Sequence, residues 1–235
     1  MSDLHTRIQR AVGAVECEKV MSRHVYWHSA GIHRDEWEEY WSKSVDITWG
    51  HGWGRQDDRY SYYFSYVLEK ERNAFKTFMG IKLKYPDVEN CTRLDGVAEY
   101  SNHLTTSPVI EVAEDGKSAK ALWQFQAADT RVTACGPLSI WKIGYMAADL
   151  VEEDGEFKVL NLLYALDIDH PCAEPWTEPS KYAPDPEFAA FDIPEPQPTV
   201  PMEVYRAYSV DRPYQELPKM PVPYTTLAET FSYGI

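Results

Sequence analysis

Apolar residues and histidines near the start of the chain recur with the period of an α-helix. Between Glu16 and Ala30 they follow one another at intervals of three, one, three, one and three residues, which places them on one helical face. The residues on this face are Cys17, Val20, Met21, His24, Val25 and His28. Gly31 follows, and a glycine directly after a periodic segment indicates the end of a helix.

Two further helices are predicted in the N-terminal third of the chain. A short one covers residues 33–42 and has Trp37, Tyr40 and Trp41 on its apolar side. A longer one covers residues 60–83 and stops before a Tyr-Pro pair, because the residue before proline avoids helical backbone angles.

The pattern then changes to that of β-strands. Residues 45–49 predict a short first strand, and residues 50–58, GHGWGRQDD, predict a glycine-rich loop. Later strands flank two Asp-Gly pairs, which are typical of tight hairpin turns. These later strands are predicted at residues 93–106, 109–113, 118–127, 138–152 and 156–169. Three helices followed by an antiparallel meander indicate an α+β fold, in which a strongly curved sheet packs on helices.

The composition changes sharply after Asp169. Thirteen of the sixteen prolines lie in residues 171–235, and proline interrupts helices and central strands. The same segment carries six tyrosines, three phenylalanines and Trp176, an aromatic content that indicates docking onto a protein surface. We therefore expect a domain over residues 10–169, and an extended proline-rich arm over residues 170–235 that packs on it or on a neighbouring subunit.

Charge and composition argue against several classes of partner. The net charge is -14, whereas nucleic acids and anionic membranes both attract basic surfaces. No stretch approaches the roughly 20 apolar residues of a membrane span, and the N-terminus, MSDLHTRIQR, lacks the apolar core of a signal peptide. Four scattered cysteines without CxxC spacing fit a reduced protein, so a cytoplasmic location is expected.

Four segments, in this order, resemble SnoaL-like proteins of the nuclear-transport-factor-2-like superfamily. They read HVYWHSAGIHRDEWEEYW, VDITWG, NHLTTSPVIEVAEDGKSAKALW and EEDGEFKVLNL. The resemblance covers about residues 10–169 and implies a cone-shaped sheet, closed by helices, around one small-molecule pocket. It does not select a reaction, because the superfamily includes dehydratases, isomerases, cyclases, dehydrohalogenases and non-catalytic binding modules. The aromatic-rich sequence and long tail are also similar to its lignin-dimer (diarylpropane) formaldehyde-lyase branch.

The resemblance implies catalytic roles for three histidines. Dehydratases of this superfamily use a His–Asp pair and a tyrosine, without cofactor or metal, and their strand histidine matches His103. The positions of the family's tyrosine and aspartate fall on His28 and His33, so the partners of a simple His–Asp dyad are replaced in this chain. His103, His28 and His33 are therefore the candidate acid–base residues.

Each of these histidines also has a structural interpretation. His103 would serve equally as a half-buried residue bonded to a backbone carbonyl, and His33 stands where a helix start needs a cap. His24 and His28 have the spacing of a metal-binding pair. No HExxH motif and no later ligand cluster completes that pair in the sequence, so we predict neither a metal site nor a cofactor.

Six side chains near the predicted pocket are candidates for substrate binding. They are Tyr26, Trp49, Arg59, Tyr63, Trp123 and Tyr145. In so acidic a chain, an arginine at a pocket mouth would attract a phenolate or a carboxylate. The alternative for Arg59 is a surface ion pair with Asp57 or Asp58. Strand parity alone does not decide which of the strand aromatics line the pocket.

These observations favour a cofactor-independent lyase that dehydrates or deformylates a small hydroxylated aromatic compound, such as a lignin-derived diarylpropanediol. Two alternatives stay open, namely a dehydratase or isomerase of a steroid- or polyketide-like substrate, and a non-catalytic small-molecule-binding module. We also expect a homo-oligomer, a dimer or trimer, because the open face of the sheet must be covered.

Overall fold

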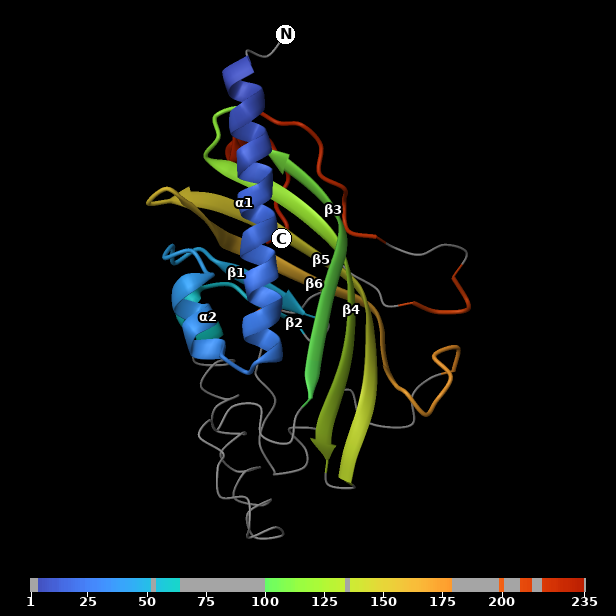
Figure 1. The fold of residues 1–235 in the computed structure, drawn as a ribbon. Coiled ribbons are helices and arrows are strands. Elements are labelled where there is room, and N and C mark those ends of the chain that lie inside the picture. Colours follow the sequence, from blue (N-terminus) through green and yellow to red (C-terminus); the bar gives the residue numbers. More distant parts are fainter. Residues whose placement is uncertain are drawn as a thin grey trace.

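The computed structural model describes residues 4–51, 54–63, 100–133, 136–178, 199–200, 208–212 and 217–234. Its helices are α1 (Leu4–Ser29), α2 (His33–Glu39), α3 (Arg59–Tyr62) and a 3₁₀ turn, η2 (Leu227–Glu229). Its strands are β1 (Thr48–His51), β2 (Gly54–Gln56), β3 (Ser101–Val112), β4 (Ser118–Thr133), β5 (Gly136–Glu153) and β6 (Glu156–Pro171). They form one sheet in the order β2-β1-β6-β5-β4-β3, and α1 lies across one of its faces (Figure 1). The predicted α+β class is confirmed.

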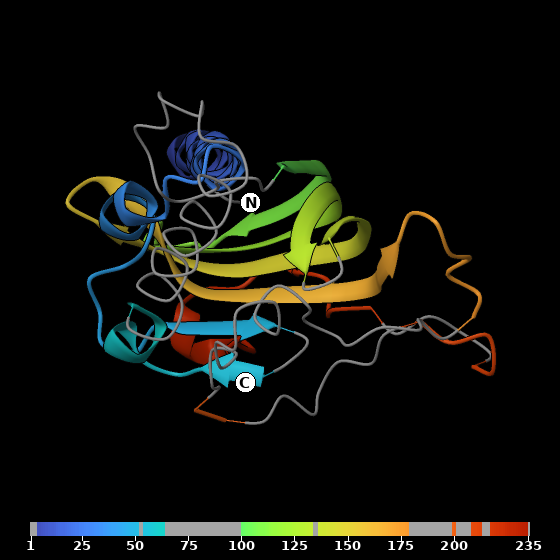
Figure 2. The same ribbon diagram turned by 90° about the horizontal axis from the view of Figure 1, so that it is seen from below.

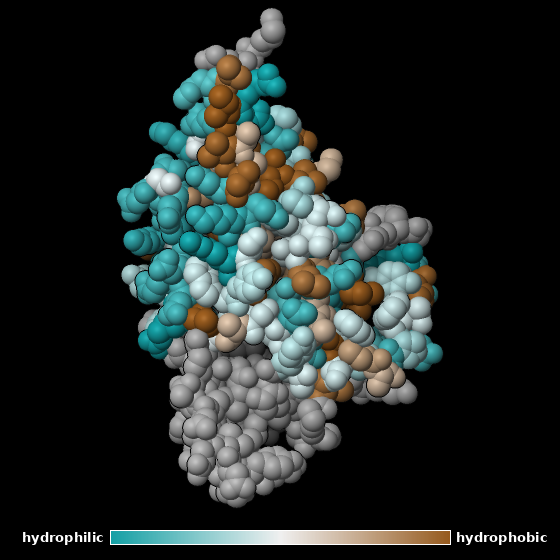
Figure 3. Space-filling view, in the orientation of Figure 1, coloured by the Kyte–Doolittle hydropathy of each residue, from teal (hydrophilic) through white to brown (hydrophobic). Residues whose placement is uncertain are grey.

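Helix α1 covers the sheet with a stripe of small and apolar residues. It begins at Leu4, well before the predicted start at Glu16. The buried residues of α1 are Gly13, Cys17, Met21 and His24. Apolar side chains also gather on the outer side of its N-terminal half (Figure 3). Those exposed residues are Leu4, Ile8, Val12 and Val15. Within the described ranges, no helix is both long enough and apolar enough to cross a bilayer.

The turn after α1 brings α2 back beside the end of the first helix. The amide of Ile32 donates to the carbonyl of Trp27, and the amide of Gly31 donates to the carbonyl of His28. These two bonds define a Schellman motif, in which the residue after the helix takes a left-handed conformation. Gly31 has a φ of 68° and adopts this conformation without strain. The predicted stop at Gly31 is therefore confirmed, and α2 returns alongside α1 (Figure 1).

The sheet is mixed, which corrects the expectation of an antiparallel sheet. Strands β3 to β6 do form the predicted antiparallel meander, with Gly116 and Gly155 at positive φ in its two Asp-Gly turns. Strand β1, however, runs parallel to β6, with Thr48 opposite Asn161. The predicted loop over residues 50–58 contains the end of β1 and all of β2, which pair as a short hairpin. Strands this short carry no alternation from which a pairing direction could be predicted.

One predicted break is a register shift within a single strand. Residues 101–112 form one continuous strand, β3, where two strands ending and starting at 106 and 109 were expected. The pairing with β4 shifts between Thr106 and Val109, and Ser107 there has a φ of 49°. Such a bulge interrupts the ladder without ending the strand. Residues 93–99 of that prediction, and residues 64–83 of the predicted third helix, lie outside the described ranges.

The C-terminal segment runs along the other face of the sheet (Figure 2), where it covers a buried ion pair. Lys120 Nζ lies 2.5 Å from Asp149 Oδ1, and both side chains have no exposed surface. Asp149 also accepts hydrogen bonds from Asn161, Ser232 and the amide of Tyr233. A buried carboxylate is tolerated where donors surround it in this way. The described end of the 170–235 segment thus contacts its own domain, while the division at residue 169 stays a prediction.

The substitution Asp149→Asn tests this arrangement. It would leave the Lys120 ammonium buried without its anion, and breaking a buried pair typically costs about 3–5 kcal/mol of unfolding free energy. Urea unfolding should show that loss. Glu156→Gln is the control, because its pair with Lys158 is solvent-exposed on the glutamate side and its loss should barely change the urea midpoint. Equal midpoints for the two variants would contradict the importance assigned to Asp149.

Candidate active site

Histidines from three separate elements converge between the helices and the sheet. His24 and His28 are one turn apart on the same face of α1, His33 begins α2, and His103 lies in β3. The rings of His28 and His103 stack with their centroids 4.5 Å apart, and the centroid of His33 lies 4.8 Å from that of His28. The three predicted acid–base candidates are therefore neighbours.

A single buried carboxylate holds the helical histidines together. Glu36 is 1% exposed, and its Oε1 lies 2.6 Å from His24 Nδ1. Its Oε2 lies 3.4 Å from His28 Nδ1 and 3.5 Å from His33 Nδ1. Burial alone would raise the pKa of Glu36, but His24 and the other imidazoles outweigh burial and hold that pKa well below its ordinary value. The group is therefore an anion at neutral pH.

A second carboxylate backs the strand histidine. Asp129 Oδ1 lies 3.6 Å from His103 Nε2, and Asp129 Oδ2 lies 2.7 Å from Lys142 Nζ. The hydroxyl of Ser101 donates to Asp129 Oδ1 over 3.1 Å. Although burial acts to raise it, the pKa of Asp129 is strongly lowered because Lys142 and His103 lie so close. The backbone amide of His103 donates to Ser29 Oγ, which ties β3 to the end of α1.

Two of the clustered histidines favour their neutral form. Burial lowers the pKa of His28 well below its ordinary value, and the neighbouring His103 adds to this effect, against an opposing influence of Glu36. Burial also lowers the pKa of His103, although Asp129 acts in the opposite direction. His103 Nδ1 is buried and has no hydrogen-bond partner among the described residues. A neutral imidazole with an unused ring nitrogen can accept a proton.

Aromatic side chains surround the histidines. The ring of Phe125 meets His103 edge-on with the centroids 5.1 Å apart, and Tyr164 packs on Phe125 at 4.6 Å. Tyr40 stacks on His24 at 4.6 Å, and burial raises the pKa of its hydroxyl well above the usual range. His28 has the most accessible side chain of the four histidines, with 18% exposed against 8% or less for the others. Of the four rings, that of His28 is therefore the most exposed to solvent.

Two of the predicted substrate-binding residues lie beside α2. The guanidinium of Arg59 sits 3.9 Å from the centroid of the Trp37 ring and donates to the carbonyls of Ser42 and Trp37. Tyr63 packs against the same indole, with a centroid distance of 5.2 Å. Asp58 caps α3 by accepting from the amides at its start, and Asp57 accepts from the hydroxyl of Thr199. The described contacts therefore do not include the alternative ion pair of Arg59 with Asp57 or Asp58.

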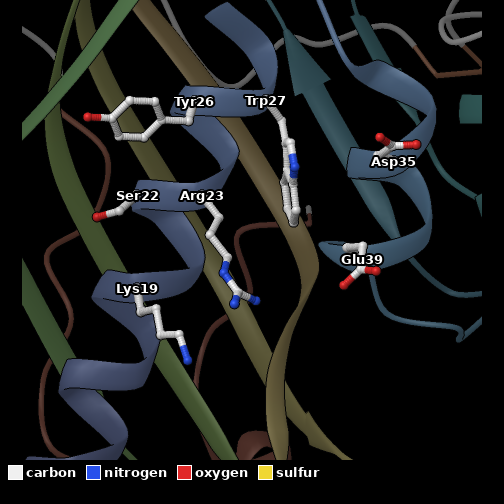
Figure 4. A pocket seen from close by; sticks show the side chains of 7 residues that line it. All are labelled: Lys19, Ser22, Arg23, Tyr26, Trp27, Asp35 and Glu39. Atoms are coloured by element: carbon white, nitrogen blue, oxygen red, sulfur yellow. The ribbon is translucent and has the colours of Figure 1, made fainter. Parts of the chain in front are cut away.

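The other four predicted substrate-binding residues are placed elsewhere. Tyr26 is 78% exposed and extends away from Trp27 in an outer groove between α1 and α2 (Figure 4). Trp49 is buried in the core, and Trp123 is buried with its indole NH donating to Glu18. Tyr145 alternates with the core residue Met146 along β5, so its side chain lies on the opposite face of the sheet from His103. Tyr26 and Tyr145 therefore point away from the histidines, whereas Trp49 and Trp123 belong to the hydrophobic core.

Sequence reasoning missed the two carboxylates and Lys142. Glu36 was detectable, because it follows His33 by three residues and therefore shares its helical face. Asp129 was not, because its approach to His103 depends on strand register. Glu36 also adds a third possible metal ligand to the His24–His28 pair, for which the sequence alone indicates no further ligand. One donor atom from each of these three residues lies within 4.8 Å of the others.

Comparisons with known proteins give the fold and leave the chemistry open. No family model matches the sequence, and no curated protein matches it. LinA is 11% identical with a TM-score of 0.50, and the match covers 74% of this chain and 99% of LinA. A candidate scytalone dehydratase from Novosphingobium aromaticivorans DSM 12444 is 13% identical over 77% of this chain and 99% of its own, with a TM-score of 0.49.

A protein from Salmonella enterica serovar Typhimurium, described as belonging to the nuclear-transport-factor-2-like superfamily, is 10% identical. That match covers 70% of this chain and 98% of the other, with a TM-score of 0.47. At such identities a structural likeness concerns the fold alone. The chain therefore shares the fold of LinA.

Proposed function

We propose that this protein is a cofactor-independent lyase that acts by acid–base catalysis on a small hydroxylated aromatic compound. One observation carries the proposal. His103, a buried histidine that favours its neutral form, has a carboxylate behind one ring nitrogen and an unused nitrogen on the other side. His28 stacks against it and has its own carboxylate, Glu36.

Asp129 determines which ring nitrogen of His103 can act as the base. Ionised Asp129 only accepts hydrogen bonds, so it favours the tautomer whose proton is on Nε2. The distance of 3.6 Å is longer than a hydrogen bond, and such contacts in ligand-free sites often tighten when substrate binds. Nδ1 then keeps its lone pair and serves as the base. His28, the more accessible ring, favours its neutral form and can hydrogen-bond the leaving hydroxyl, while the proton that this hydroxyl needs comes from the protonated His103.

An elimination balances when His103 carries the proton through both halves of the reaction. Its Nδ1 takes a proton from the substrate, the freed electron pair forms a double bond, and the protonated ring gives that proton to the leaving hydroxyl, which departs as water. With a diarylpropanediol, loss of the benzylic hydroxyl as water would give a quinone-methide-like intermediate. Deprotonation of the terminal hydroxyl and cleavage of its C–C bond would then release formaldehyde and a stilbene.

The surroundings support an aromatic substrate. Phe125 and Tyr164 flank His103, and the Trp37–Tyr63 pair with Arg59 lies at α2. Rings of this kind bind flat ligands, and an arginine binds a phenolate. We also propose that the site is an enclosed pocket, that the substrate derives from lignin, and that the protein forms a homo-oligomer. The alternatives are a dehydratase or isomerase of a steroid- or polyketide-like compound, and a binding module without turnover.

The substitution His103→Gln tests the assignment of the base. Loss of a general base typically lowers the rate by about 10²- to 10⁴-fold. The assay supplies a diarylpropane-1,3-diol with a free phenol and measures formaldehyde and stilbene, followed by hydroxylated steroid and polyketide panels. Tyr26→Phe is the control and should keep full turnover, since Tyr26 is exposed on the far side of α1. An intact, folded His103→Gln protein with parental turnover would disprove the role of His103.

The pH dependence of turnover provides an independent test. A base works when neutral, so activity should persist below pH 6.5, the ordinary pKa of histidine, and fall only at the lowered pKa of His103. Lys142→Gln removes a cation that lowers this pKa, so the acid limb should move to higher pH. Asp129→Asn removes an anion that raises it, so the limb should move to lower pH while the rate falls. Acid limbs that shift in the same direction in both variants, or that do not shift in either, would contradict the proposed pairing of His103 with Asp129.

A further inference from the structure

We propose that His24, His28 and Glu36 form a binding site for a divalent transition-metal ion of the zinc type. A bound ion would occupy His28 and so suppress turnover. This suppression rests on the proposed function, whereas the existence of the metal site does not depend on it. The site joins two helices, with His24 and His28 one turn apart on α1 and Glu36 on α2.

The distances around Glu36 resemble those between the ligands of one ion. Zinc bonds to nitrogen and oxygen are about 2.0–2.2 Å long, so neighbouring ligands of a tetrahedral ion lie about 3.4 Å apart. Glu36 Oε2 is 3.4 Å from His28 Nδ1 and 3.5 Å from His33 Nδ1. Both contacts are long for hydrogen bonds and close to this ligand spacing. His33 is thus in reach as a fourth ligand, in a position that water could otherwise fill.

One contact must open for the ion to enter. His24 Nδ1 and Glu36 Oε1 are only 2.6 Å apart, which is the length of a strong hydrogen bond. Metal binding would displace the proton that lies between these two atoms, either to the other ring nitrogen of His24 or to solvent. The required lengthening is under about 1 Å, given the ligand spacing of a tetrahedral site. The partial exposure of His28 provides the route of entry.

The chemistry of the donors selects the class of ion. Imidazole nitrogens with one carboxylate suit zinc and its neighbours in the first transition row, whereas calcium and magnesium prefer oxygen ligands. Imidazole ligands bind an ion in their neutral form, so the carboxylate supplies the single negative charge of the ligand set and offsets half of the charge of a divalent ion. Neighbouring residues already hold the site in shape. The ring of Tyr40 stacks on His24, and the backbone amide of Tyr40 donates to the carbonyl of Glu36.

The test is calorimetric titration of the full chain with zinc sulfate after treatment with EDTA and dialysis. We expect one saturable ion per chain. His24→Gln should weaken binding at least tenfold while retaining a hydrogen-bonding group beside Glu36. His5→Gln is the matched control, because it removes a histidine of the same helix that lies far along α1 from the cluster.

The outcomes separate the site from the function. Absence of a saturable heat, or equal affinity in His24→Gln and the parent protein, would overturn the site. Cobalt(II) should give the visible absorption of a tetrahedral ion in the parent protein and lose it in His24→Gln, and an octahedral spectrum in both would also overturn it. Saturable binding with unchanged turnover would overturn the suppression alone. Zinc inhibition that EDTA reverses would support both parts.

Discussion

The register shift in β3 decides which side chains of the sheet face the helices. Above the shift, Val109 pairs with Leu122, whereas below it Thr106 pairs with Gln124, so three residues of β3 span two of β4. Val112 and His103 are both buried on the core side of the sheet, although one has an even and the other an odd residue number. Without the shift, His103 would point away from α1, because a change of one residue moves a side chain to the other face. The stacking on His28 and the approach to Asp129 both depend on this bulge.

Buried carboxylates impose a second constraint on both faces of the sheet. Glu36 and Asp129 lie on the helix side, and Asp149 lies beneath the C-terminal segment. A charge removed from water is costly unless close partners replace the solvent, and each carboxylate has such partners. The partners differ in kind, however. Asp149 is paired with a lysine in a closed structural arrangement, whereas Glu36 faces imidazoles that can change their protonation state. That difference separates the side with proposed chemistry from the side that stabilises the fold.

The sequence predicted much of the scaffold and part of the cluster. The helical face of α1, the stop at Gly31 and the two Asp-Gly hairpins followed from local patterns, and the resemblance pointed to His28, His33 and His103. The break near residue 107 was also visible, but its consequence was not, because a bulge and a strand end look alike in sequence. Asp129, the direction of β1 and the face occupied by Tyr145 depend on pairing between distant segments, which local periodicity does not contain.

The central claim is that His103 is neutral, protonated on Nε2, and basic at Nδ1. Nitrogen-15 NMR of histidine-labelled protein measures this directly, because protonated and unprotonated ring nitrogens have well-separated chemical shifts. At pH 7 we predict a His103 spectrum with a protonated Nε2 and an unprotonated Nδ1, assigned by the loss of its signals in His103→Gln. A His103 that is doubly protonated at pH 7, or that carries its proton on Nδ1, would contradict the proposed role of Asp129 and the identity of the base.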